Sequence, residues 1–159
     1  MENSELLNLA REFFDYVNGQ FIRIKSTKGQ KAGGRAGCLS SSDGYRYIRL
    51  KRKRYLEHRM VYFIHNPDWD INDRSQEIDH INRIRDDNRI ENLRLVTHQE
   101  NKFNRNAKGY RWHKQRKKWE ARIQINGKYI HLGYFDYKTD ARLAYVTAKA
   151  KHHIIEDRK

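Results

Sequence analysis

The stretch from residue 76 to residue 104 constrains the fold most, because it predicts two strands and a helix around one polar loop. The segments QEIDHI and LRLVT have the composition of short strands, and the polar segment NRIRDDNRIEN joins them. Thr97 is followed three residues later by Glu100, which is the pattern of a capping box. A helix is therefore expected to begin at residue 98, directly after the second strand.

The rest of the chain is expected to form small modules. Apolar residues make up 37% of the chain and charged residues 34%, which is too little apolar material for one large core. Before the central stretch, the patterns predict a helix over 4–17 that Asn18-Gly19 ends, strands over 21–25 and 45–50, and a helix over 57–65. After it, residues 110–135 predict three antiparallel strands with Asn126-Gly127 as a hairpin turn, and residues 138–152 predict a helix.

The distribution of charge favours a nucleic acid as the partner. The net charge is +14, and residues 21–59 and 100–159 are strongly cationic, whereas residues 60–99 carry five Lys or Arg and eight Asp or Glu. Carboxylates between two cationic segments suit a protein that holds a metal ion near a phosphate, although most of them are expected to be solvated loop residues. Cys38 is the only cysteine, which excludes an internal disulfide and a Cys-rich zinc site. No apolar run is long enough to span a membrane and no signal peptide is recognisable, so a cytoplasmic protein is expected.

Four polar residues of the central stretch have the chemistry that phosphodiester hydrolysis requires. His80 is a candidate general base because imidazole exchanges a proton near neutral pH. Asp79 and Asn101 offer hard oxygen ligands that suit Mg²⁺ or Mn²⁺. Asn92 is expected to hold the second ring nitrogen of the imidazole.

This stretch resembles the HNH nuclease motif of phage and intron homing endonucleases, in which "DH", "NL" and "EN" occur in this order and at this spacing. EHRMVYFIHNP just upstream resembles the segment that precedes the motif in that family. The resemblance implies a ββα-metal (His-Me finger) core, with His80 as general base, one divalent ion on Asp79 and Asn101, and Asn92 positioning His80. Many members have His at the position of Asn101, so this is a variant site, and His98 or Asn104 remains open as a further ligand.

The C-terminal segment resembles the DNA-binding domain of plant ethylene-response factors, a three-stranded sheet packed on one helix. The matching residues are Gly109, Trp112, Trp119, Ala121, Ile123, Leu132, Gly133, Phe135, Ala141, Ala144 and Tyr145. Alternation along the second strand places Trp119, Ala121 and Ile123 toward the helix and Arg122 and Gln124 on the opposite face. Arg and Gln on such a face have the groups that read guanine and adenine in a major groove.

The expected DNA contacts fall into two sets. Near the nuclease motif they are Arg83, Arg85, Lys102 and Arg105. On the C-terminal sheet and its first turn they are Arg111, His113, Arg116, Arg122, Gln124 and His131.

Together these features predict an α+β protein in three parts. These are an N-terminal helix with a basic loop or hairpin (1–44), an HNH nuclease domain (45–105) and an ethylene-response-factor-like DNA-binding domain (109–155). The expected activity is metal-dependent, site-guided cleavage of double-stranded DNA of the homing type, in a phage or its bacterial host. No membrane and no small-molecule substrate is expected. A strand-nicking monomer is favoured over a dimer. The alternatives are a non-catalytic DNA-binding regulator and an RNA-directed or structure-specific nuclease.

Overall fold

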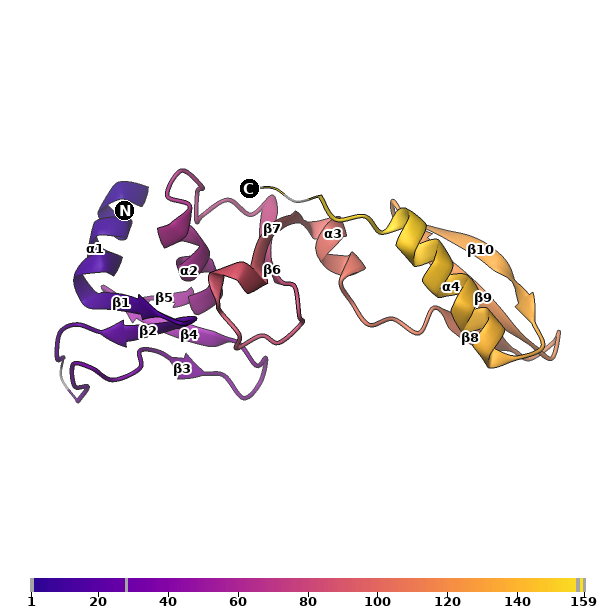
Figure 1. Ribbon diagram of the computed structural model, residues 1–159, viewed down its shortest axis with the longest axis horizontal. Helices are drawn as coiled ribbons and strands as arrows, with labels where there is room; N and C mark the ends of the chain where they lie inside the picture. The colour runs from indigo at the N-terminus through magenta and orange to yellow at the C-terminus, as the bar shows by residue number, and fades with distance from the viewer. Residues whose placement is uncertain (1, 28, 157, 159) are drawn as a thin grey trace. The chain divides into compact units, whose positions relative to one another are not determined.

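The computed structural model describes residues 2–27, 29–156 and 158, and it divides into two compact units (Figure 1). The N-terminal unit runs to Val96, and the C-terminal unit runs from Thr97 to Glu156. The boundary falls between the second strand of the central stretch and the helix that follows it. It therefore lies inside the range 45–105 predicted for a nuclease domain, and the three-part division stays a prediction.

The N-terminal unit consists of three small sheets, two α-helices and one 3₁₀ turn. Its elements are α1 (Asn3–Phe13), β1 (Phe14–Val17), β2 (Gln20–Arg23), β3 (Cys38–Leu39), β4 (Arg46–Leu50), β5 (Lys53–Leu56), α2 (Glu57–His65), β6 (Gln76–His80), η1 (Ile90–Asn92) and β7 (Leu93–Thr97). The sheets are β1-β2, β3-β4-β5 and β6-β7. The helix predicted over 57–65 is confirmed with the same bounds.

The N-terminal helix is shorter than predicted. It ends at Phe13, and Phe14–Val17 form strand β1, which pairs antiparallel with β2. Asn18 and Gly19 both have positive φ angles, of 46° and 81°, and Val17 lies opposite Gln20. This is the geometry of a two-residue hairpin turn that Asn-Gly favours. The interpretation of this dipeptide as a helix stop was wrong, because it turns a hairpin.

Residues before and after position 44 share one core. Leu6 and Ala10 of α1, Phe21 of β2, Ile48 of β4 and Phe63 of α2 are all buried in the same apolar cluster. Burial of such side chains is the main source of stability in a small domain. The segment 1–44 is therefore part of the body that carries the central stretch.

The C-terminal unit consists of α3 (His98–Phe103), β8 (Tyr110–His113), β9 (Lys118–Ile125), β10 (Lys128–Phe135) and α4 (Lys138–His152). The three strands form an antiparallel sheet in the order β10-β9-β8, as predicted. Ala121 and Ile123 of β9 and Ala141 and Tyr145 of α4 are buried, which confirms the predicted packing face. Gly109 makes this packing possible, because a Cβ there would lie within 1.9 Å of the Tyr145 ring.

The predicted capping box is confirmed. The Thr97 hydroxyl accepts from the Glu100 backbone N–H, and the Glu100 carboxylate accepts from the Thr97 backbone N–H. The α4 helix begins at the predicted residue with Tyr137 at its N-cap, without a capping side chain. Among the described residues, no helix has the length and apolar content needed to span a membrane.

Candidate active site

The last two residues of β6 carry the central motif, and both are buried. Asp79 and His80 are 7% and 4% exposed. Successive side chains of a strand point to opposite faces, so the two residues have different surroundings. Asp79 pairs with Arg94 of β7, whereas the His80 ring lies near His58 of α2 and Tyr45.

A chain of hydrogen bonds holds the His80 ring. His80 Nε2 lies 2.9 Å from Asn88 Oδ1, and Asn88 Nδ2 donates to Glu57 Oε2 at 2.9 Å. The contact with the Glu57 carboxyl group fixes which way the Asn88 amide points. Its Oδ1 can only accept, so His80 Nε2 must carry the proton. In the neutral ring Nδ1 is then the atom with the lone pair that can take a proton.

Burial keeps this imidazole in its neutral form. Desolvation lowers the pKa of His80 below the usual value, against the opposing effects of the Asn88 hydrogen bond and the Asp79 charge. The pKa of His58 is lowered well below the usual value, mainly by burial and next by the charge of His80. The two rings lie edge to face with centroids 4.9 Å apart. Both rings therefore favour the neutral form at neutral pH, and His58 belongs to the protein interior.

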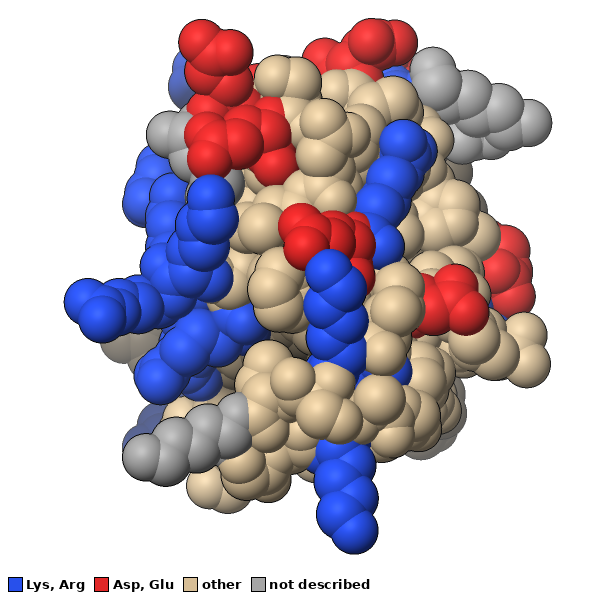
Figure 2. Space-filling view, turned by 90° about the vertical axis from the view of Figure 1, so that its left-hand side faces the viewer, with Lys and Arg blue, Asp and Glu red and all other residues tan. Residues whose placement is uncertain are grey.

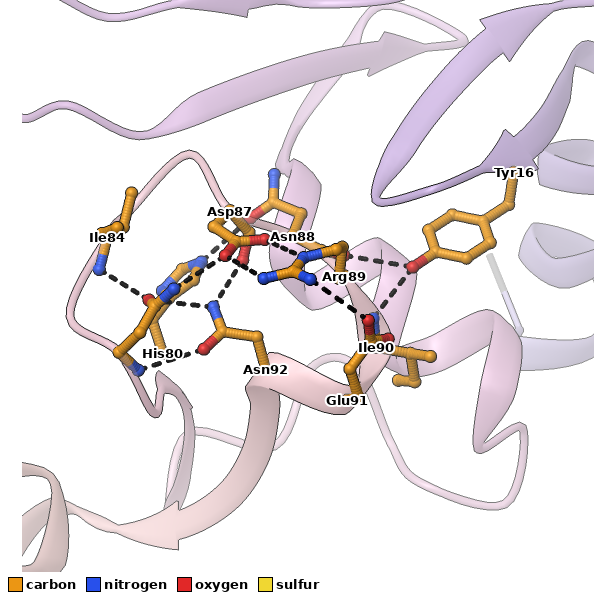
Figure 3. A network of polar contacts seen from close by, with 10 residues as sticks. Tyr16, His80, Ile84, Asp87, Asn88, Arg89, Ile90, Glu91 and Asn92 are labelled. Atoms are coloured by element: carbon orange, nitrogen blue, oxygen red, sulfur yellow. Dashed lines mark hydrogen bonds and ion pairs between the residues drawn. The ribbon is translucent and has the colours of Figure 1, made fainter.

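Asn92 acts on the loop and makes no hydrogen bond to the His80 ring, as Figure 3 shows. Asn92 Oδ1 accepts from the Asn82 backbone N–H at 3.0 Å, and Asn92 Nδ2 donates to the Asp87 carbonyl at 2.7 Å. The direct contact predicted for Asn92 is made by Asn88 instead. The reason is geometric, since Asn92 ends the loop and ties its two sides together, whereas Asn88 lies within it opposite the ring. Asn92 can thus position His80 only through the loop.

Sequence reasoning missed Glu57, the buried acid behind Asn88. Glu57 is fully buried, and its Oε2 lies 3.5 Å from Arg46 Nε and 3.9 Å from Arg35 Nη2. Burial raises the pKa of Glu57, while the Phe21 backbone N–H and the two arginines oppose that rise. Asp86 also pairs with both arginines, at 2.9 Å from Arg46 and 3.3 Å from Arg35. An acid at the start of an apolar helix was the only sequence signal, and it equally suits a helix N-terminus.

The two predicted metal ligands lie in different units. Asp79 Oδ2 accepts from Arg94 Nη2 at 2.7 Å and from Arg94 Nε at 3.0 Å. Asn101 lies on α3, which begins the C-terminal unit, with His98 at the start of that helix and Asn104 at its C-cap. Within the described part of the chain, no group of three or more His, Cys, Asp or Glu side chains could hold a metal ion. The pairing of Asp79 with Asn101, and any role of His98 or Asn104, stay predictions.

The predicted DNA contacts near the motif are exposed. Arg85 donates to the Asp43 carbonyl at 2.7 Å and lies 5.0 Å from the Tyr45 ring centroid. Arg83 has a φ angle of 67° in the turn directly after β6. Lys102 and Arg105 belong to the C-terminal unit, where both are exposed.

A hollow in the C-terminal unit brings together half of the predicted DNA contacts. It has a volume of about 680 Å³, and its lining includes no Asp or Glu. The predicted residues that line it are Lys102, Arg105, Arg111, Arg122 and Gln124. Four cations around one hollow form a surface suited to an anionic ligand.

The face of the β8-β9-β10 sheet that points away from α4 contains an acid that sequence reasoning also missed. Glu120 pairs with Arg111 at 2.6 Å and lies 3.5 Å from His131 Nδ1. The Arg111 guanidinium holds the pKa of Glu120 below its usual range. Arg122 lies over the Tyr129 ring at 4.5 Å. Arg122 is thus the better candidate for a base contact, because Arg111 is already paired.

His113 and Arg116 cluster at the far end of this sheet. The His113 and Tyr134 rings are 5.2 Å apart, and the Arg116 guanidinium lies 4.7 Å from the Tyr134 ring. The Arg116 backbone N–H also lies 3.3 Å from His113 Nδ1. The side chains of His113 and Arg116 therefore both pack against the Tyr134 ring.

Comparison with known proteins bears on the central stretch. Neither a curated protein nor a solved structure matches the chain. Residues 55–103 match a family model described as HNH endonuclease, and this range includes α2, the His80 network and α3. The match covers less than half of the 159 residues, and it leaves the resemblance to ethylene-response factors and the homing type as predictions. It supports an HNH nuclease at residues 55–103, a range that contains the buried Asp79-His80 pair.

Proposed function

We propose that the chain is a metal-dependent endonuclease that hydrolyses phosphodiester bonds of duplex DNA at selected sites. One observation carries the proposal. The histidine of the family-matched segment is buried, uncharged and fixed in one tautomer by Asn88 and Glu57. A ring prepared in this way is suited to accept a proton from water, which is the role of a general base.

The proton acceptor is Nδ1 of His80. Because Asn88 Oδ1 accepts from Nε2–H, the ring keeps its orientation while Nδ1 takes the proton. The positive charge that then forms on the ring is stabilised by the same hydrogen bond, with the Glu57 carboxyl group behind it. The deprotonated water would attack the phosphorus as the P–O3′ bond breaks, and a second water would protonate the leaving 3′-oxygen, which gives 5′-phosphate and 3′-hydroxyl ends.

We propose that the reaction uses a hard divalent ion, Mg²⁺ or Mn²⁺. Asp79 and Asn101 would hold it through a carboxylate oxygen and an amide oxygen, both of which such ions prefer. When bound, the ion supplies a Lewis acid that neutralises charge on the phosphate. Arg94 Nη2 already lies 2.7 Å from Asp79 Oδ2, so an ion bound there would share this carboxylate with the guanidinium.

The proposal assigns the C-terminal unit to DNA binding. Arg122 and Gln124 lie side by side on the sheet face away from α4, and Lys102 and Arg105 join them around the hollow. One nuclease site cuts one strand, so we propose that a monomer nicks DNA and that a break in both strands needs two events. The homing type remains part of this proposal.

Cleavage of a supercoiled plasmid tests the activity. Protein treated with a chelator should leave the plasmid intact, and added Mg²⁺ or Mn²⁺ should convert it to the nicked circle. A protein that binds DNA but never cuts it with either metal would be a DNA-binding regulator. Cutting of RNA or branched DNA in preference to the plasmid would indicate a structure-specific nuclease.

A matched pair of variants tests the metal ligand. Asp79→Asn and Asp70→Asn each remove one negative charge, but Asp70 is exposed and caps the turn at Asn72. Asp79→Asn should lose metal-dependent cutting and the binding of Mn²⁺ measured by electron paramagnetic resonance. Asp70→Asn should keep both. Equal Mn²⁺ binding by the two variants would contradict the role of Asp79.

A further inference from the structure

A basic groove in the N-terminal unit lies apart from the His80 network. It has a volume of about 600 Å³ and is lined by apolar side chains of α1 and by cations of the strands and of the segments that follow or join them. None of its lining residues belongs to the network of Figure 3. Figure 2 shows that Lys and Arg side chains gather along one side of a face of this unit. The cations that line the groove are Arg23, Lys25, Arg49, Lys51, Arg52 and Arg54.

Among the residues that the structure describes, no Asp or Glu lines the groove. Two of its cations pair with carboxylates of α1, Lys25 with Glu12 and Lys51 with Glu5. All four of these side chains are more than half exposed, so the pairs contribute little to stability. Within the described residues, Arg49 and Arg52 have no ion pair. The groove therefore keeps a strong positive potential.

The β4-β5 hairpin places like charges against each other. Arg49 lies directly opposite Arg54 in the register, and the Arg54 guanidinium lies 3.5 Å from the Tyr47 ring. Like charges at directly opposed positions destabilise a strand pair. An anion bound between them would remove that repulsion.

The turn of this hairpin also consists of two charged residues that do not suit its backbone conformation. Leu50 lies opposite Lys53, so Lys51 and Arg52 form a two-residue turn with φ angles of 41° and 68°. The turns at Asn18-Gly19 and Asn126-Gly127 have the same length and positive φ, but they use the residues that this geometry prefers. Lys and Arg are strained in this conformation, whereas Asn and Gly adopt it readily. The positive charge of their side chains, and not their backbone preference, therefore accounts for Lys51 and Arg52 at these positions.

We propose that this groove binds the phosphate backbone of duplex DNA, as a second contact separate from the cutting site. The inference rests on the proposed function, which makes duplex DNA the substrate. Phosphate contacts fix a protein on the duplex without reading its sequence. The groove would therefore add affinity and leave the choice of site to other residues.

The single cysteine gives a direct probe. Cys38 is exposed and lines the groove. Saturating duplex DNA, with binding followed by fluorescence anisotropy, should slow alkylation of Cys38 at least tenfold. The control is a Cys38→Ser, Asp68→Cys protein, whose new thiol lies at an exposed position outside the groove and should react at the same rate with and without DNA.

Replacement of the turn separates a binding role from a structural one. Lys51→Asn with Arg52→Gly installs the preferred turn residues, so the melting temperature should rise. The slope of log K for DNA against log salt concentration should become shallower by about 2, because each lost phosphate contact changes it by about 0.9. Arg49→Gln, which leaves the turn unchanged, should make it shallower by about 1.

The proposal is overturned if DNA binds, yet the alkylation rate of Cys38 and both salt slopes stay unchanged. It is also overturned if duplex RNA protects Cys38 and duplex DNA does not. Plasmid cutting by the wild-type protein distinguishes these failures from failure of the proposed function. If the wild-type protein cuts the plasmid but DNA does not protect Cys38, the groove proposal fails and the proposed function stands.

Discussion

The surroundings of His80 and the C-terminal sheet face both carry polar residues suited to DNA chemistry, but they are built differently. His80, Asn88 and Glu57 are each less than 9% exposed, and each is fixed by a neighbour that is itself buried. On the sheet, Arg122 and Gln124 are less buried, and their contacts are with Tyr129 and the Gly127 carbonyl. The first region is preorganised, and the second can adapt.

This difference predicts how each region responds to substitution. In a preorganised site, loss of one group changes the rate of the chemical step and little else. On an exposed cationic face, neighbouring charges share the contact with DNA, so loss of one changes affinity by a limited amount. Four substitutions test this difference between the two regions, from the largest expected effect to the smallest.

Replacement of His80 by Ala should reduce the rate of cutting by about 10²–10⁴-fold, because it removes the general base. The affinity for DNA should stay within twofold of the wild type, since a buried neutral ring holds no phosphate. Single-turnover cutting and anisotropy titration measure the two effects. The control is His152→Ala, at an exposed position on α4. A matching fall in the affinity for DNA would contradict the idea that the surroundings of His80 set the rate of cutting and the sheet face sets the affinity.

Replacement of Asn88 by Ala should reduce the turnover number by about 10²-fold without changing KM, as expected for a residue that positions another. His80 would lose the partner that fixes its tautomer. The ¹⁵N chemical shifts of the ring report the tautomer directly, and they should move from a single Nε2–H form to a mixture. Unchanged shifts would show that Asn88 has only a structural role.

An internal control is Asn82→Ala, which removes a loop contact of Asn92 and leaves the Asn88 hydrogen bonds in place. It should slow cutting less than Asn88→Ala does. Chemical denaturation of both variants separates these effects from a loss of folded protein, because Asn88→Ala also leaves Glu57 without one donor.

The sequence predicted the elements that depend on local signals. The capping box at Thr97 and Glu100, the turn at Asn126-Gly127 and the bounds of α2 and α4 follow from residues close together in the chain. The first helix was predicted too long because Asn-Gly suits both a helix end and a hairpin turn. Local pattern alone does not separate these two outcomes.

The candidate site was predicted less completely, for a physical reason. Asp79 and His80 stand out as an adjacent pair, and Asn88 lies only eight residues from His80, but the groups behind Asn88 come from distant segments. Glu57 is 31 residues from Asn88, and Arg35 is 51 residues from Asp86. Three asparagines, Asn82, Asn88 and Asn92, lie in one polar loop, and only the fold decides which of them faces the ring.

Replacement of Arg122 by Ala should weaken DNA binding roughly tenfold, in the lower part of the 1–3 kcal/mol range typical of a contact to a base. The loss is limited because Lys102 and Arg105 line the same hollow and keep their charge. Competition with DNA libraries should also show relaxed preference at one position of the target. Lys118→Ala, which removes an exposed partner of Asp136, should weaken binding equally for all sequences. An effect on cutting rate at saturating DNA would contradict this difference between the two regions.

The smallest effect concerns the dependence of folding stability on pH. The pKa of His58 is depressed in the folded state, so below about pH 6.5 the unfolded chain takes up a proton that the folded chain refuses. The stability from this residue is therefore complete above pH 6.5 and is lost as the pH falls, by at most about 1.4 kcal/mol per pH unit. His58→Phe keeps a ring between Tyr45 and His80 and should remove that part of the slope. Glu57 remains in both proteins, so its contribution cancels, and the difference in slope reports His58 together with its coupling to His80. Urea unfolding at pH 5.5, 6.5 and 7.5 measures it, and parallel curves for the two proteins would mean that His58 is not a buried neutral ring.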